Sequence, residues 1–286
     1  MYPVGIRMFM SALLSMSFFS FLARVERVEA TVVCVAIATV SVFFFMLILR
    51  LMDELKDREI DLELFRDRPL PSGRVLESDI KFSLVCVVIL YILVNLCTGK
   101  ALWMALAGLA YSGLMFKYFF IPNVLRRHLL LNLATHNPVI LILLWYLVTL
   151  FSEDQGVRLS GHLSLKLQLL AMYWLPLFAW EVSRKIRSGE EENEYVTYSQ
   201  IFGRGGAVLL AAAAQSTSLA LAIVLYFLLN LSSVFLVLLA IGYGITMFGH
   251  IRFLLRSNPS TSKLKKFAEI YVLSLCVAQL TGSYFQ

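Results

Sequence analysis

Long apolar stretches with few or no charges recur along the chain, and they limit the folds open to it. We place them at residues 8–23, 30–49, 80–98, 101–116, 129–150, 167–180, 207–229, 231–249 and 270–284. About 20 apolar residues in a helix cross a bilayer, and only helices or closed barrels satisfy their own backbone groups in lipid. The sequence therefore predicts an all-α integral membrane protein, with nine transmembrane helices in a single membrane domain over residues 1–286.

The composition agrees with a membrane-embedded chain. Apolar residues make up 59% of the 286 residues and charged residues 15%, whereas soluble domains have about 45–50% and about 25%. The formal net charge is +6. Anionic lipid head groups and diphosphates can account for this charge, so we expect the lipid bilayer as a partner and no nucleic acid.

The distribution of Lys and Arg predicts the orientation. With the amino terminus and the loops after the second, fourth, sixth and eighth stretches on one side, that side holds twenty of the 25 basic residues. Positive charge of this kind marks the cytoplasmic side. We therefore expect these loops to face the cytoplasm, across the inner or plasma membrane if the protein is bacterial.

An acidic segment follows the second apolar stretch. If the helix continues through it, Asp53, Asp57 and Asp61 lie on one face, with Glu54 beside the first of them. Like charges four residues apart repel by about 0.2–0.5 kcal/mol per pair, so a nearby cation would stabilise this face. Mg²⁺ prefers one or two carboxylates together with phosphate oxygens. The segment predicts metal-bridged binding of a phosphorylated lipid at the membrane edge.

This segment and the turn after it resemble the first aspartate-rich motif of the UbiA-type intramembrane prenyltransferases. That motif commonly reads N-D-x-x-D-x-x-x-D and is followed by R-P-L-P-S-G-R. Asp53 stands where the family has Asn, Glu54 stands where it has Asp, and Asp57 and Asp61 match; residues 68–74 match throughout. The resemblance implies nine helices in a UbiA-type bundle. It also implies Mg²⁺ as cofactor, with Asp53, Glu54, Asp57 and Asp61 as ligands.

The family places its second aspartate-rich motif after the sixth helix, and here the chain departs from the pattern. Residues 181–206 contain no aspartate, and Glu181 is the one acid at the membrane edge, followed by Arg184 and Lys185. We expect Glu181 to bind a second metal or the diphosphate side, with an internal ion pair to Arg184 or Lys185 as the alternative. Glutamates at 190, 191, 192 and 194 could substitute from the loop or simply be solvated, and Thr197 and Gly203 fit the end of the family motif.

Basic residues provide candidate diphosphate ligands. Arg68 and Arg74 flank a Pro- and Gly-containing turn and can each hold phosphate oxygens bidentately. Lys117 ends the fourth stretch, where the resemblance implies a diphosphate-binding basic residue and a catalytic role beside Asp57 and Asp61. Arg7 resembles an arginine often found near the start of the first helix. The alternatives are charges that set the topology, or a lysine that extends to the interface.

Two polar residues, His136 and Asn137, precede Pro138 and interrupt the fifth stretch. Polar side chains near a proline can satisfy backbone groups that it frees, and acceptor binding is the other interpretation.

Together these features predict a Mg²⁺-dependent intramembrane prenyltransferase that moves an isoprenyl group from a prenyl diphosphate to a hydrophobic, aromatic or lipid acceptor. The reaction itself is implied by the resemblance. One alternative is a terpene cyclase on the same scaffold, in which the substrate's own double bonds capture the cation. A second is a non-catalytic lipid-binding membrane protein that has lost its second aspartate motif.

Overall fold

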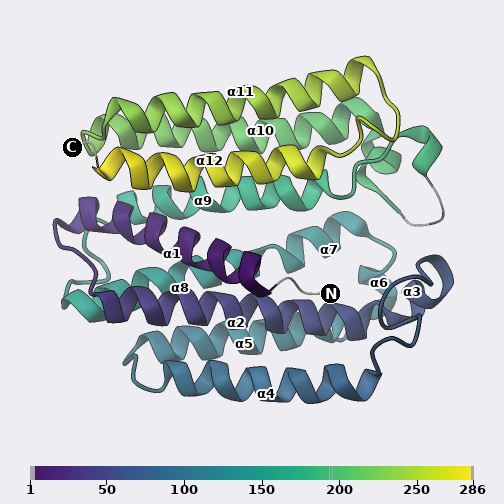
Figure 1. The fold of residues 1–286 in the computed structure, drawn as a ribbon, viewed down its shortest axis with the longest axis horizontal. Coiled ribbons are helices and arrows are strands. Elements are labelled where there is room, and N and C mark those ends of the chain that lie inside the picture. Colours follow the sequence, from purple (N-terminus) through teal and green to yellow (C-terminus); the bar gives the residue numbers. More distant parts are fainter. Residues whose placement is uncertain (1–3, 193, 195, 285–286) are drawn as a thin grey trace.

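The chain folds into a bundle of helices that run side by side (Figure 1). A computed structural model describes residues 4–192, 194 and 196–284, and in these residues it contains helices and no strand. The long helices are α1 (Val4–Glu26), α2 (Val32–Lys56), α4 (Glu77–Asn95), α5 (Ala101–Phe116), α8 (Pro138–Gln155), α9 (Leu163–Ser183), α10 (Tyr198–Leu228), α11 (Ser233–Leu255) and α12 (Leu264–Tyr284). The short ones are α3 (Arg58–Leu64), α6 (Pro122–Leu125) and α7 (Leu129–His136), with 3-10 turns η1 (Tyr118–Phe120) and η2 (Gly189–Glu191).

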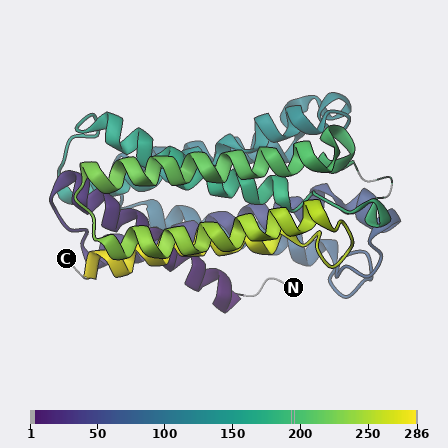
Figure 2. The ribbon, with the colours of Figure 1, turned by 90° about the horizontal axis from the view of Figure 1, so that it is seen from above.

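The helices gather in two groups. In Figure 1, α9 to α12 form one group and α2, α4, α5 and α8 the other, while Figure 2 shows how elongated the bundle is. Helix α1 packs against α2 and α8 and also against α9 and α12, so it joins the groups. Aromatic rings lie where α1 meets the group α9 to α12: Phe21 lies edge-on to Tyr173 at 6.0 Å and to Phe235 at 5.6 Å between ring centroids. Such edge-to-face pairs stabilise a core beyond the area that they bury.

Each predicted apolar stretch overlaps one or two helices, and those at 30–49, 80–98, 207–229 and 231–249 extend one to three residues beyond them. The fourth stretch coincides with α5, and the fifth is divided into α7 and α8 at Asn137, because Pro138 cannot donate a backbone hydrogen bond. Within the described residues, 6 helical stretches are long and apolar enough to cross a membrane: Val4–Glu26, Val32–Lys56, Leu129–Gln155, Leu163–Ser183, Tyr198–Leu228 and Ser233–Leu255. The number of nine membrane-spanning helices stays a prediction.

One end of the bundle gathers the segments that the sequence singles out. The carboxyl ends of α2, α5 and α9, with α3, α6 and the loop between α11 and α12, lie at the right of Figure 1. Which side of a membrane this end faces follows only from the Lys and Arg distribution, so the cytoplasmic orientation stays a prediction. The two loops expected to carry the site thus lie at the same end of the bundle, although more than a hundred residues separate them in sequence.

The opposite end is closed by internal polar contacts. The Lys166 ammonium is fully buried, pairs with the Glu26 carboxylate at 2.6 Å and donates to the carbonyl oxygens of Arg158 and Leu159. A buried ion pair with its remaining protons satisfied holds its elements in one arrangement. This pair fixes α1 against α9, and with them the relative position of the two groups of helices.

Candidate functional site

The acidic segment does not lie on a single continuous helix. Helix α2 ends at Lys56, Asp57 caps it with φ −88° and ψ 3°, and α3 begins at the next residue. The break is small, because the amide of Asp57 donates to the carbonyl of Asp53, and the amide of Asp61 donates to that of Asp57, both at 2.9 Å. The predicted spacing of the three aspartates therefore survives the break.

The acidic side chains of this segment fall into two classes. Glu54 forms an ion pair with Arg50 one turn earlier, and the buried Asp61 pairs with the Arg68 guanidinium at 2.6 Å. Asp53 and Asp57 are different: within the part of the chain that the structure describes, neither carboxylate has a hydrogen bond or an ion pair. The structure thus brings Arg68 to Asp61 and, among the residues it describes, gives two acids of the motif no direct partner.

The electrostatics of Asp53 and Asp57 fit a cation. Asp53 retains exposed surface although protein surrounds it on most sides, and its charge repels that of Asp57. Burial raises the pKa of the Asp57 carboxyl, Lys56 opposes this shift, and Asp61 adds to it. The described residues contain no group of three acidic, His or Cys side chains arranged to hold a metal. Two carboxylates nevertheless fit Mg²⁺, which takes its other ligands from water and substrate phosphate.

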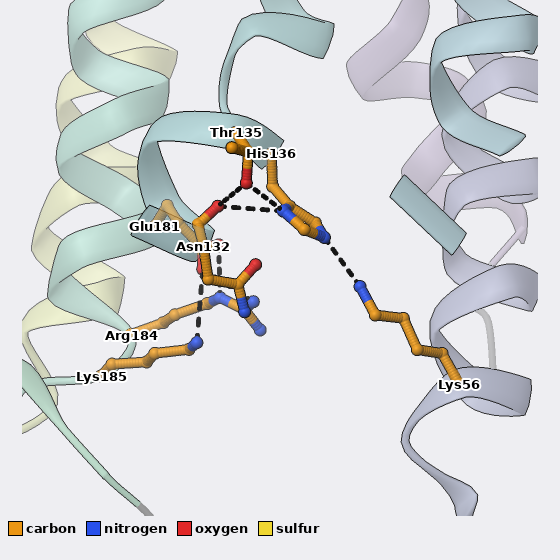
Figure 3. Close-up of polar contacts among 7 residues, drawn as sticks. All are labelled: Lys56, Asn132, Thr135, His136, Glu181, Arg184 and Lys185. Atoms are coloured by element: carbon orange, nitrogen blue, oxygen red, sulfur yellow. Dashed lines mark hydrogen bonds and ion pairs between the residues drawn. The ribbon is translucent and has the colours of Figure 1, made fainter. Parts of the chain in front are cut away.

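Lys56 lies between these two aspartates in sequence, and its side chain is held in place. The ammonium donates to the Met115 carbonyl at 3.2 Å, lies 2.8 Å from His136 Nε2, and sits 3.9 Å above the Tyr118 ring centroid. His136 Nδ1 is 2.9 Å from the Asn132 carbonyl, which can only accept, so Nδ1 carries the proton and Nε2 accepts from Lys56. Figure 3 shows Lys56 reaching from α2 to His136.

The turn that presents Tyr118 is strained. Tyr118, Phe119 and Phe120 all have positive φ, at 50°, 50° and 61°, in the left-handed region that costs non-glycine residues about 1–2 kcal/mol each. Such strain persists only where the surroundings enforce it, and it concentrates at functional sites. Here the strained turn places an aromatic face against the Lys56 ammonium, and the Arg126 guanidinium lies 5.1 Å from the same ring.

At the end of α9, a single acid meets two cations. The Arg184 Nε and Nη2 donate to the two Glu181 oxygens at 2.5 and 2.8 Å, and Lys185 Nζ lies 4.0 Å from Glu181. The internal pair expected as the alternative role of Glu181 is thus present. Asp53 interacts electrostatically with Glu181 and Arg184, and Asp57 with Arg184 and Lys185. The ends of α2 and α9 therefore face each other, as the orientation of Lys56, Arg184 and Lys185 in Figure 3 shows.

The glutamates of the loop after α9 have local structural partners. Glu191 accepts from the Ser188 amide and hydroxyl at 3.1 and 2.8 Å, and Glu192 accepts from the hydroxyls of Thr197 and Ser199. Thr197 caps α10, and Gly203 has φ 67° within that helix, a conformation that glycine adopts without strain. Asn193 and Tyr195 of this loop lie outside the described residues.

The other predicted basic residues make local contacts. The exposed Lys117 caps α5 with its ammonium 5.4 Å from the ring centroid of its neighbour Phe116. Arg74 bonds to Ser72 and to the Asp67 carbonyl within its own turn. Arg7 is exposed near the start of α1. The acidic motif by itself assigns Lys56 no role in binding, although the position of Lys56 inside the motif is a signal for one.

An apolar pocket lies between α5, α8 and α9, open to the outside, and Leu167 in its wall is half exposed. Its volume is about 470 Å³. Its walls are Met104, Leu141, Ile142, Trp145, Leu167, Leu170, Ala171 and Trp174. The Trp174 indole donates to the Asn137 side chain, next to His136. The pocket is thus connected to Lys56 through Trp174, Asn137 and the neighbouring His136.

Comparisons with known proteins bear on the fold and the family. The family model described as the UbiA prenyltransferase family matches residues 12–273. The structure of a UbiA homologue from Aeropyrum pernix K1 is similar, with a TM-score of 0.74 at 14% identity over 100% of this chain and 99% of that one. A digeranylgeranylglyceryl phosphate synthase gives a TM-score of 0.62 at 18% identity, over 98% and 96%. No curated protein sequence matches the chain. The predicted all-α membrane fold is confirmed.

Proposed function

The chain belongs to the UbiA prenyltransferase family, and we propose that it transfers an isoprenyl group from a prenyl diphosphate to a hydrophobic acceptor, aromatic or lipid, in a Mg²⁺-dependent reaction. The observation that carries this proposal is the pair Asp53 and Asp57. These carboxylates repel each other and lack direct protein partners within the described part of the chain. Such a pair is stabilised by a divalent cation and, through it, by a diphosphate.

The residues around the pair have separate roles in this proposal. Asp53 and Asp57 hold Mg²⁺, which when bound serves as a Lewis acid and a template for the departing diphosphate. Lys56, fixed by His136 and Met115, keeps a positive charge beside the developing anion. Asp61 acts indirectly, because its ion pair with Arg68 holds the turn that follows α3.

The apolar pocket supports a hydrocarbon substrate. Its lining is almost entirely apolar, and it lies beside α9, whose end carries Arg184. An isoprenyl tail can occupy such a pocket while its diphosphate remains among the charged residues at the end of the bundle. Trp145 and Trp174 in the lining can stabilise an allylic cation through their ring faces.

The test uses the full-length protein in liposomes with geranylgeranyl or farnesyl diphosphate, with Mg²⁺ or EDTA, and with or without an aromatic acceptor. We expect diphosphate release and a prenylated acceptor only with both Mg²⁺ and acceptor. We expect Asp57→Asn to abolish this release. Glu63→Gln, which changes an exposed acid of α3, is the matched control and should retain activity.

Each rival predicts a different result in the same assay. Release of a hydrocarbon or alcohol without acceptor would identify a terpene cyclase. Binding of the diphosphate lipid that is independent of Mg²⁺ and unchanged in Asp57→Asn, without turnover, would identify a non-catalytic lipid-binding protein and contradict the proposal.

A further inference from the structure

Positive charge dominates the end of α9, where the family pattern predicts a second metal site. Both oxygens of Glu181 accept from the Arg184 guanidinium, at 2.5 and 2.8 Å, and Lys185 Nζ lies 4.0 Å away. A metal bound by Glu181 would have to displace a bidentate guanidinium, which is among the strongest partners of a carboxylate. It would also lie close to two cations.

The neighbouring loop does not supply the missing acids. Glu191 and Glu192 are bonded to Ser188, Thr197 and Ser199 of their own loop. Glu190 lines a separate depression of about 500 Å³ with Arg187 and Arg204. Glu191 and Glu192 are therefore used locally, and Glu190 lies beside other arginines.

The cations of α9 face the proposed metal site. Arg184 interacts electrostatically with Asp53 and Asp57, and Lys185 interacts with Asp57 and also with the ammonium of Lys56. In Figure 3 Arg184 and Lys185 extend from α9 toward the side on which Lys56 lies. A diphosphate held by a metal on Asp53 and Asp57 would thus have cationic side chains opposite it.

We propose that Arg184 and Lys185 bind the diphosphate directly and replace a second divalent cation, so that the protein uses one metal ion per diphosphate. This inference rests on the proposed function. The planar guanidinium of Arg184 can pair with two phosphate oxygens, and Lys185 adds a point charge. Glu181 is then a positioning residue that orients the guanidinium, and it is not a metal ligand.

The test counts metal ions. Full-length protein in detergent micelles is titrated with Mn²⁺ at saturating inorganic pyrophosphate, and electron paramagnetic resonance measures bound Mn²⁺ per protein. We expect one Mn²⁺ per bound pyrophosphate. Two bound ions would overturn the inference.

Variants at the end of α9 locate the ions. Arg184→Ala should weaken pyrophosphate binding about 10–100-fold, the value of a charged hydrogen bond, and still bind one Mn²⁺. Arg184→Lys keeps the positive charge but loses the planar guanidinium that can pair with two oxygens. Its pyrophosphate affinity should lie between those of Arg184→Ala and the wild type. Glu181→Gln should also keep one Mn²⁺ and change pyrophosphate affinity less than about 5-fold, within the range of an exposed ion pair. Loss of a Mn²⁺ ion in Glu181→Gln would identify it as a ligand and overturn the inference.

Asp57→Asn separates this inference from the proposed function. If Asp57→Asn binds Mn²⁺ and pyrophosphate as the wild type does, the proposed metal site is wrong and this inference falls with it. If Asp57 is required but the wild type holds two ions, only the one-metal inference is wrong.

Discussion

The ends of α2 and α9 occupy comparable places in the two groups of helices but differ in charge. At α2, Asp53 and Asp57 have no direct partner among the residues that the structure describes, while Glu54 and Asp61 pair with Arg50 and Arg68. At α9, a single carboxylate is neutralised by a bidentate arginine with a lysine beside it. The charges at the end of α2 therefore favour binding of a cation, and those at the end of α9 favour binding of an anion.

The difference shows that acidic residues in a motif are not equivalent. A carboxylate paired with a guanidinium already has its charge compensated, and releasing it costs free energy before a metal is bound. A carboxylate that faces another carboxylate is stabilised when a cation binds, because the cation offsets the repulsion between the two negative charges. The presence or absence of an internal partner therefore separates candidate metal ligands from acids that hold the local structure.

The largest expected difference in activity is between variants of two adjacent acids, Asp53 and Glu54. We expect Asp53→Ala to lower Mg²⁺-dependent kcat/KM by about 100-fold or more, because even outer partners of metal ligands contribute about 10–100-fold. We expect Glu54→Gln to lower it less than about 5-fold, because exposed ion pairs contribute about 0–1 kcal/mol. The measurement is the Mg²⁺ dependence of diphosphate release for both variants.

The reverse order would break the comparison. If Glu54→Gln loses activity and Asp53→Ala keeps it, Glu54 leaves Arg50 when the metal binds, and pairing in the structure is no guide to function. Equal melting temperatures of the two variants in detergent would show that the difference arises at the site.

Much of the fold could be predicted because apolar length is a direct physical requirement of the bilayer. The stretch 101–116 gave the bounds of α5 without error, and Pro138 marked the break between α7 and α8. Apolar length does not mark the ends of several helices, because these helices continue past their apolar stretch into polar and charged residues. Helix α10, for example, begins at Tyr198 although its apolar stretch was placed from 207.

The site could be predicted only in part, because sequence spacing does not specify partners. The acidic segment was identified, yet the pairing of Asp61 with Arg68 depends on how the turn after α3 folds back. Lys56 gained its importance from His136, eighty residues away. Contacts of this kind depend on how α2 packs near α7, which no local pattern encodes.

A smaller effect should distinguish the two lysines near the site. We expect Lys56→Met to lower kcat/KM about 10–100-fold, because hydrogen bonds to charged groups contribute about 1.5–3 kcal/mol. We expect Lys117→Met to lower it less than about 5-fold, because an exposed cation–π contact contributes about 0.5–1 kcal/mol. Steady-state kinetics at saturating Mg²⁺ measure both. A larger loss in Lys117→Met would place the diphosphate near the end of α5 and away from α9.

The smallest effect on catalysis should come from the paired aspartate, and its main effect should be on stability. Asp61 is 4% exposed in its side chain and its partner Arg68 is 44% exposed, so removing the charge leaves a half-exposed arginine without its partner. We expect Asp61→Asn to lower the free energy of unfolding by about 1–3 kcal/mol and to leave Mn²⁺ affinity within about 3-fold of the wild type.

Arg68→Met should destabilise the protein similarly. The double variant should lose less free energy of unfolding than the sum of the two single losses, as expected for residues in contact. Thermal unfolding in detergent with Mn²⁺ titration measures these quantities. If Asp61→Asn instead loses Mn²⁺ without loss of stability, Asp61 is a ligand, and the division of the motif into paired and unpaired acids fails at the residue where the pair is most buried.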